Sequence, residues 1–126
     1  MCIEKYTKQY AGELYAIARI LVGFLFLCHG LQKVGFLGGD AMTGFMAFIG
    51  WTELIGGAAV MVGVLTQWAA LGCAIIMVGA YVQVHMGKAL LPLDNGGEMA
   101  LLYLAAFLVV LSYGAGKWSI EASQKK

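Results

Sequence analysis

Residues 44–86 read GFMAFIGWTELIGGAAVMVGVLTQWAALGCAIIMVGAYVQVHM, and Glu53 is the one Asp, Glu, Lys or Arg among them. The stretch divides at Thr66-Gln67 into two apolar runs, 44–66 and 68–86, of 23 and 19 residues. A helix needs about 20 apolar residues to cross a bilayer core about 30 Å thick. Each run therefore predicts one membrane-spanning helix, and the short connection between them predicts a tight antiparallel hairpin.

Glycines in this stretch predict close contacts between helices. Gly56 and Gly63 lie seven residues apart in the first run, and Gly72 and Gly79 lie seven residues apart in the second. Small residues let helix backbones approach one another in a membrane, where the hydrophobic effect no longer drives helices together. We therefore expect these glycines at helix–helix interfaces.

Apolar runs of similar length flank this pair on both sides. Residues 14–31 contain Arg19 as their one charged side chain, and residues 99–116 contain none. The predicted fold is thus an all-α membrane protein, an antiparallel four-helix transmembrane bundle. We expect one transmembrane domain over residues 1–126, with spans at about 14–34, 44–66, 68–87 and 98–116.

The composition supports this class and excludes others. Of 126 residues, 61% are hydrophobic and 12% are charged, and the formal net charge is +1. A soluble domain has about 25% charged residues. The low charge excludes a disordered chain and a nucleic-acid-binding protein, and three cysteines are too few for a secreted disulfide scaffold. The expected partner is the lipid bilayer, and no nucleic-acid partner is expected.

The basic residues predict the orientation of the bundle. Five lysines flank one end of the predicted spans and two flank the other: Lys5, Lys8, Lys117, Lys125 and Lys126 against Lys33 and Lys88. Basic residues near span ends concentrate on the cytoplasmic side. We therefore expect a multi-pass protein of the cytoplasmic (inner) membrane with both termini in the cytoplasm.

Two charged residues lie deep in the predicted spans. Arg19 and Glu53 would each cost about 2.5 to 3.5 kcal/mol in hydrocarbon, so both should face the bundle interior. We expect them to form an ion pair that joins the first two helices. Further polar residues converge near the outer end of the bundle and, with Glu53, form a predicted ligand-binding set: His29, Gln32, Lys33, Glu53, His85 and Glu98.

The order of these residues resembles the DoxX family of membrane proteins. The resemblance is carried by Arg19, His29-Gly30-Leu31-Gln32-Lys33, Glu53-Leu54-Ile55-Gly56-Gly57, His85, Glu98 and Gly114-Ala115-Gly116-Lys117-Trp118-Ser119-Ile120-Glu121. Glu121 stands where the family usually has aspartate. The family is similar in architecture to the membrane subunit of thiosulfate:quinone oxidoreductase. The resemblance implies a four-helix fold, and some relatives are linked to redox complexes or quinones and others to the assembly of membrane or secreted proteins.

Our leading functional hypothesis is therefore a membrane subunit of a redox system that binds a quinone or a similar small molecule. His29, Gln32, Lys33 and His85 could donate hydrogen bonds to the ring oxygens, and three aromatic residues are expected to line the apolar part of the slot: Phe24, Phe26 and Tyr81. No motif encodes a cofactor, and two histidines without a ligand motif favour neither haem nor a metal site.

Other functions fit the same residues. Glu53 could exchange a proton for a substrate in a small proton-coupled transporter, or the chain could be a membrane assembly factor without a small-molecule substrate. No catalytic residue is identified, and no electron-carrying group is encoded. Oxidoreductase activity would therefore need a soluble or membrane redox partner, and a homo-oligomer is also compatible with the sequence.

Overall fold

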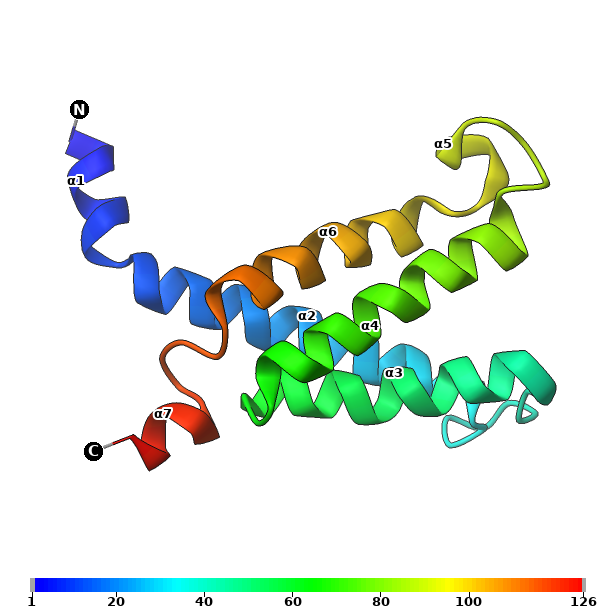
Figure 1. The fold of residues 1–126 in the computed structure, drawn as a ribbon, viewed down its shortest axis with the longest axis horizontal. Coiled ribbons are helices and arrows are strands. Elements are labelled where there is room, and N and C mark those ends of the chain that lie inside the picture. Colours follow the sequence, from blue (N-terminus) through cyan, green and yellow to red (C-terminus); the bar gives the residue numbers. More distant parts are fainter. Residues whose placement is uncertain (1, 126) are drawn as a thin grey trace.

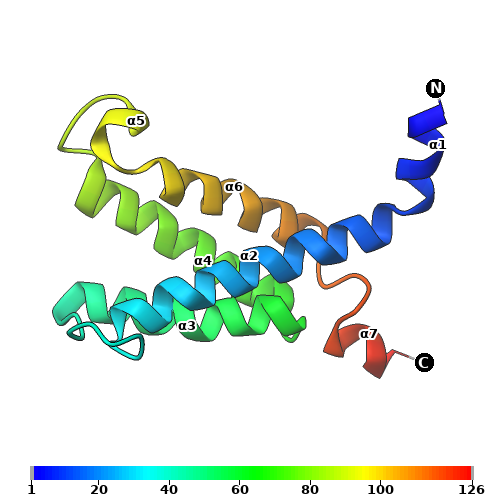
Figure 2. The ribbon, with the colours of Figure 1, turned by 180° about the vertical axis from the view of Figure 1, so that it is seen from behind.

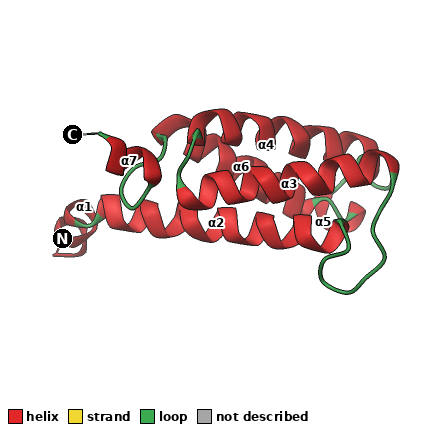
Figure 3. Cartoon of the chain, turned by 90° about the horizontal axis from the view of Figure 1, so that it is seen from below, coloured by secondary structure: helices red, strands yellow, loops and turns green. Residues whose placement is uncertain are grey.

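Residues 2–125 are described by a computed structural model in which they form helices and loops, with no strand among them (Figure 3). The expected all-α architecture is confirmed. The elements in chain order are α1 (Cys2–Gln9), α2 (Ala11–Lys33), α3 (Gly44–Val62), α4 (Thr66–Ala80), η1 (Tyr81–His85), α5 (Pro92–Asn95), α6 (Glu98–Tyr113) and α7 (Ile120–Gln124). Lys126, which the charge count included, lies outside the described residues.

Three helices are long and apolar enough to cross a membrane, namely α2, α3 and the continuous helix Thr66–His85 formed by α4 and η1. The fourth apolar helix, α6, has 16 residues and ends at Tyr113, short of the predicted limit at Gly116. The helix ends because Gly114 adopts φ +78° and ψ −153°, a backbone conformation that residues other than glycine rarely adopt. At 1.5 Å per residue, α6 spans about 24 Å.

The four apolar helices form two antiparallel pairs. α2 packs most extensively on α3, and α6 packs on α4, while α3 also contacts α4. The two pairs diverge toward the end of the bundle that carries α5, as seen from both sides in Figures 1 and 2. Both chain ends lie at the opposite end of the bundle, next to α1 and α7 (Figure 1). We call these the α5 end and the termini end.

Glycines hold α2 and α3 together, but they are not the glycines expected from the sequence, of which Gly56 instead faces Cys73 on α4. A Cβ on Gly23 would lie 2.7 Å from the Gly57 carbonyl oxygen, and a Cβ on Gly30 would lie 2.7 Å from that of Gly50. Both distances are too short for a real side chain. By contrast, a Cβ on Gly72 would have no neighbour within 4 Å, and the same is true of Gly79. The expectation of close helix contacts at those two glycines is wrong within the described chain, because no other helix comes within 4 Å of a Cβ at either position.

The centre of the bundle is an aromatic cluster. Phe26 of α2 is fully buried, and its ring centroid lies 4.7 Å from that of Phe107 and 5.0 Å from that of Tyr103, both on α6. Tilted and edge-on ring pairs at such distances are favourable beyond the area they bury. Phe26 therefore bridges the two helix pairs from the core.

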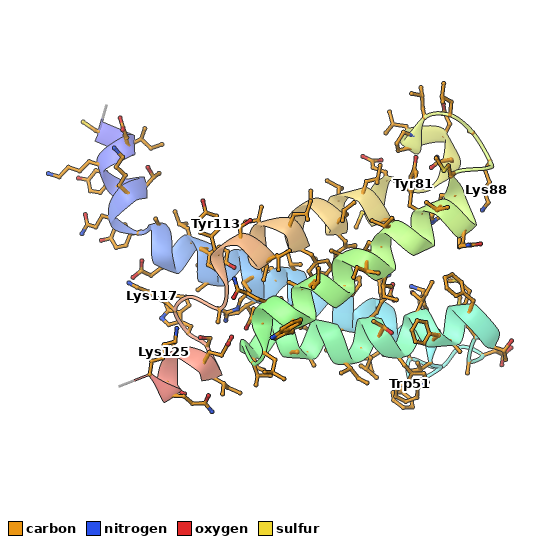
Figure 4. All side chains as sticks on the ribbon, in the orientation of Figure 1. Trp51, Tyr81, Lys88, Tyr113, Lys117 and Lys125 are labelled. Atoms are coloured by element: carbon orange, nitrogen blue, oxygen red, sulfur yellow. The ribbon has the colours of Figure 1, made fainter. Side chains whose placement is uncertain are left out.

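Both ends of the bundle carry aromatic side chains with a polar atom and lysine side chains. Trp51 and Tyr81 lie toward the α5 end and Tyr113 toward the termini end (Figure 4). Lys117 and Lys125 are at the termini end, and Lys88 is at the α5 end (Figure 4). Half-polar rings commonly mark membrane–water interfaces, so the two ends match the two surfaces of a bilayer.

Candidate functional site

A cavity of about 170 Å³ lies at the α5 end, where the two helix pairs diverge. All four apolar helices contribute to its wall, which is formed by His29, Lys33, Met46, Ile49, Glu53, Met77, Ala80, Val84, His85, Gly96, Met99, Ala100 and Tyr103. Four of the six residues in the predicted ligand set are in this wall: His29, Lys33, Glu53 and His85. The cavity thus combines ionisable groups with apolar side chains.

A buried ion pair forms part of this wall. Lys33 Nζ lies 2.7 Å from Glu53 Oε2, and the two side chains are 17% and 5% exposed. Lys33 is the last residue of α2 and Glu53 is in the middle of α3. A buried pair of this kind is costly to break, because removing one partner leaves the other charged and unpaired. The pair therefore fixes both charges at the cavity.

The predicted ion pair between Arg19 and Glu53 is wrong. Arg19 is fully buried, but its guanidinium donates to backbone carbonyls at the termini end, and no carboxylate pairs with it among residues 2–125. In the antiparallel α2–α3 pair, Arg19 faces Val60, which is seven residues, or about 10 Å, further along α3 than Glu53. Lys33 lies at the level of Glu53 and takes the place predicted for Arg19.

Arg19 instead joins α3 to the segment after α6. Nε donates to the Val60 carbonyl at 3.1 Å and Nη2 donates to the Met61 carbonyl at 3.4 Å. These carbonyls lie in the last turn of α3, where helix carbonyls lack partners and where a cation is favourable. The same guanidinium donates to the carbonyls of Ala115, Lys117 (2.9 Å) and Trp118 (2.7 Å). One side chain thus satisfies five backbone acceptors.

Glu121 completes this structure at the termini end. Its Oε2 accepts a hydrogen bond from Thr66 Oγ1 at 2.5 Å and from the Thr66 backbone N–H at 3.3 Å, and its own N–H donates to the Gly63 carbonyl at 3.0 Å. A carboxylate at a helix N-terminus satisfies unpaired N–H groups there. The acidic residue in the C-terminal motif therefore caps α4. We call Arg19, Thr66 and Glu121 together with residues 115–118 the C-terminal clasp.

Tyr103 is a cavity residue that sequence reasoning missed. It is 8% exposed, and its ring lies edge-on to His29 with the centroids 5.6 Å apart. Its hydroxyl is buried and has no hydrogen-bond partner in the described chain. Buried hydroxyl groups almost always have a partner. The sequence signal was a tyrosine hydroxyl in the middle of a largely apolar helix, and this signal is weak because tyrosine is common at membrane interfaces.

His85 is oriented by the loop that follows η1. Its Nδ1 lies 3.2 Å from the Asn95 carbonyl oxygen, and because a carbonyl only accepts, Nδ1 is the donor. Asn95 is itself buried, and its side chain donates to Tyr81 Oη at 3.0 Å and accepts from the Gly97 N–H at 2.7 Å. Nε2 is then the nitrogen with which His85 can contact a ligand. The π-helical turn of η1 is a feature that is frequent at functional sites.

Two residues of the predicted ligand set do not line the cavity. Gln32 is exposed, since it lies about 100° from Lys33 around α2. Glu98 is also exposed and is the first residue of α6. Its negative charge interacts favourably with the positive end of the helix dipole there. The predicted aromatic slot is also different: Phe24 is exposed, Phe26 is in the core, and Tyr81 binds Asn95.

Comparison with known proteins identifies the family. The DoxX family profile matches residues 14–86, which is more than half of the chain. The chain belongs to the DoxX family. In this DoxX protein the matched region runs from α2 to η1 and contains His29, Lys33, Glu53 and His85.

The relatives of this DoxX protein include a membrane protein and one with a redox name. An uncharacterized protein of Haemophilus influenzae is 31% identical over 124 residues, covering 90% of this chain and 92% of the relative. An uncharacterized membrane protein of Mycobacterium tuberculosis is 30% identical over 130 residues, covering 86% and 79%. A Bacillus subtilis protein named "Putative oxidoreductase CatD" is 32% identical over 78 residues, covering 56% and 58%. No solved structure matches the chain.

Among the described residues of this DoxX protein, no group of three or more His, Cys, Asp or Glu side chains is placed to hold a metal ion. His29, Glu53 and His85 share the cavity without meeting at one point. The three cysteines are free thiols: Cys2 is exposed, Cys28 is half-buried and Cys73 is buried. The side chains in the cavity wall can form hydrogen bonds and transfer protons.

Proposed function

We propose that this DoxX-family protein is a membrane subunit of a redox system and that it binds a quinone ring in the cavity at the α5 end. The observation that carries the proposal is the composition of the cavity wall. It places Lys33, Glu53, His29, His85 and the unpartnered Tyr103 hydroxyl around a space that is otherwise apolar. The redox name of the Bacillus subtilis relative supports the same class of function.

The size of the cavity supports a single ring. An apolar cavity of about 150 Å³ in another protein holds one benzene molecule. The cavity here, at about 170 Å³, is of the same order. A substituted benzoquinone ring fits this space, whereas a haem or a nucleotide is far larger. The ligand is therefore a flat molecule of about one ring.

The polar groups match the two ends of a quinone. A quinone carries two carbonyl oxygens on opposite sides of its ring, and each accepts hydrogen bonds. His29 and Tyr103 form one polar group at the cavity, with their rings in contact, and His85 forms another on η1. We propose that Tyr103 and His29 donate to one oxygen and that His85 donates to the other through Nε2, with both ring nitrogens protonated because Nδ1 already donates to the Asn95 carbonyl. The Lys33–Glu53 ion pair lies beside the proposed ring site and is shielded from lipid.

Reduction of a quinone to a quinol takes two electrons and two protons. His29 and His85 are groups that can exchange protons at the cavity. We propose that the electrons come from a redox partner protein, because no residue of the cavity wall carries electrons on its own. Glu53 is paired with Lys33 rather than poised to titrate alone, which makes proton-coupled export the weaker alternative.

We also propose that the termini end faces the cytoplasm and the cavity lies near the outer surface. Residues 2–125 contain six lysines. Four of them are at the termini end, namely Lys5, Lys8, Lys117 and Lys125, and basic residues concentrate on the cytoplasmic side of a membrane protein. The test uses a membrane-impermeant maleimide on intact cells, in a background without Cys28 and Cys73. Native Cys2 should be protected, and a cysteine introduced by Lys88→Cys with Cys2→Ser should react. The reverse pattern would contradict this orientation.

The central test is binding of duroquinone, a fully substituted quinone that does not alkylate thiols. The protein is embedded in lipid nanodiscs, and bound quinone is measured against empty nanodiscs. We expect saturable binding to the native protein. His29→Ala and His85→Ala should each weaken binding by about tenfold, which corresponds to the loss of one hydrogen bond in a buried site.

Matched controls come from neighbouring exposed residues. Gln32→Ala lies next to Lys33 on α2, and Gln83→Ala lies two residues before His85, and neither side chain lines the cavity. Both variants should bind duroquinone as the native protein does. Absence of saturable binding to the native protein, or equal binding by the histidine variants and the controls, would contradict the proposed function.

A further inference from the structure

We propose that the ligand enters the cavity sideways from the lipid, through the seam between α2 and α6, and that its apolar tail stays in that seam. The inference rests on the proposed function and adds to it a substrate class, a quinone that carries a hydrocarbon tail. It also assigns a binding role to residues outside the cavity.

Of the contacts α2–α3, α3–α4, α4–α6 and α2–α6, the seam is the weakest. α2 packs on α3 over most of its length and α6 packs on α4, but α2 and α6 touch only lightly. In the rear view of Figure 2, α2 and α6 draw apart toward the α5 end. The buried ring of Phe26 connects the two helices, and it does so in the core. The α2–α6 side therefore lacks the close packing found between α2 and α3 and between α4 and α6.

A second hollow lies along this seam. It has a volume of about 140 Å³, and it is lined by Val22, Leu25, Met99, Leu102, Tyr103 and Ala106. We call it the seam groove. Leu25, Met99 and Leu102 are each about half exposed, so the groove opens on the surface that faces lipid. Apart from the Tyr103 hydroxyl, its side chains carry no hydrogen-bonding group, as is suitable for a hydrocarbon chain.

The seam groove and the cavity share a wall. Met99 and Tyr103 line both hollows. Methionine is flexible and fills irregular gaps, so Met99 can move without a large cost. A ring that passes these two side chains reaches His29, while its tail remains against Leu25 and Ala106. This continuity is why we assign the groove to the tail of the cavity ligand and not to an unrelated lipid.

The seam groove can be filled by mutation without touching the cavity. Ala106→Trp places a large ring in the groove, whereas Ala105→Trp places the same ring on the exposed side of the same helix. Leu25→Trp fills the groove from α2 and serves as an independent variant. Each variant is assayed in nanodiscs with two probes, duroquinone, which has no tail, and decylubiquinone, which has one.

We expect Ala106→Trp and Leu25→Trp to weaken decylubiquinone binding by about tenfold or more, the affinity equivalent of a steric clash. Duroquinone binding measured at equilibrium should stay at the native level, because a filled groove slows entry of the ring but leaves the cavity contacts unchanged. Native-level binding also shows that the variants are folded. Ala105→Trp should bind both probes as the native protein does.

Three results would overturn the inference. If decylubiquinone binds Ala106→Trp and Ala105→Trp equally well, the tail does not use the seam, although the proposed function stands. If Ala106→Trp and Leu25→Trp weaken the binding of both probes to the same extent, the substitutions disturb the cavity itself and the groove has no separate role in binding the tail. If the native protein binds neither probe, the proposed function itself fails and the lateral route fails with it.

Discussion

Lys33 and Glu53 form one ion pair that serves two structural purposes, because their 2.7 Å contact both joins the end of α2 to α3 and forms part of the cavity wall. The pair lies among side chains that are largely shielded from water. Changing it therefore affects the stability of the helix pair as well as the ligand site, and the two effects can be separated by the choice of variant.

Glu53→Gln should lower the free energy of unfolding by about 3 to 5 kcal/mol, because Lys33 is left as an uncompensated buried charge. The double variant Lys33→Met with Glu53→Gln should recover a large part of this loss, since no charge then remains unpaired. Thermal unfolding in mild detergent measures both. Lys88→Met, which removes an exposed lysine at the same end, is the control and should change little. A double variant as unstable as Glu53→Gln would contradict the pairing.

Arg19→Lys should loosen the C-terminal clasp. The guanidinium donates to five carbonyls, and an ammonium group has only three donors in a different geometry. We expect a loss of about 3 kcal/mol in stability and faster amide hydrogen exchange in residues 114–121. Lys117→Ala removes the ion pair with Glu13, which is partly exposed, and should cost less than about 1 kcal/mol. Unchanged exchange in Arg19→Lys would show that the clasp does not depend on the guanidinium.

Thr66 and Glu121 should be energetically coupled. In a double-mutant cycle with Thr66→Val and Glu121→Ala, we expect a coupling energy of about 1 to 2 kcal/mol from the 2.5 Å hydrogen bond. Glu121→Gln keeps an oxygen acceptor and should lose less stability than Glu121→Ala. Strictly additive effects of the two substitutions would mean that this hydrogen bond adds nothing to α4.

Tyr103→Phe should separate binding from stability. The hydroxyl has no partner within the described chain, so its removal should leave the free energy of unfolding unchanged or slightly raised. The same substitution should weaken duroquinone binding by about tenfold if the hydroxyl donates to the ring oxygen. Phe107, a neighbouring core ring, offers a contrast: Phe107→Leu should reduce stability and leave the hydrogen bond to the ligand in place. Native-level binding by Tyr103→Phe would remove Tyr103 from the site.

Glycine substitutions should distinguish helix contacts from exposed positions. Gly57→Ala would put a methyl group 2.8 Å from the Gly23 carbonyl oxygen, so α2 and α3 would have to separate. We expect a loss of at least about 1 to 3 kcal/mol. Gly72→Ala meets nothing within 4 Å and should be neutral or stabilising by up to about 1 kcal/mol. Equal effects of the two variants, measured by thermal unfolding, would contradict the close α2–α3 contact.

Much of the fold followed from the sequence because helix formation and membrane crossing depend on local composition. The predicted spans begin and end within a few residues of α2, α3 and the α4–η1 helix. The prediction went too far at the end of α6, where the unusual φ and ψ of Gly114 cannot be read from an apolar run. The aromatic slot was also wrongly assigned, since Phe26 and Phe24 lie on different faces of α2 and only packing shows which face is buried.

The sequence alone determined that this chain is an all-helical membrane protein with charged residues inside its spans, because length, hydropathy and charge are properties of the chain itself. Only the tertiary structure decided which charges meet. Pairing depends on the axial register of antiparallel helices, and here the glycine contacts between α2 and α3 place Lys33 beside Glu53 and Arg19 beside the end of α3. The sequence identified the charged residues that can pair, and the register of α2 against α3 decided that Lys33, not Arg19, pairs with Glu53.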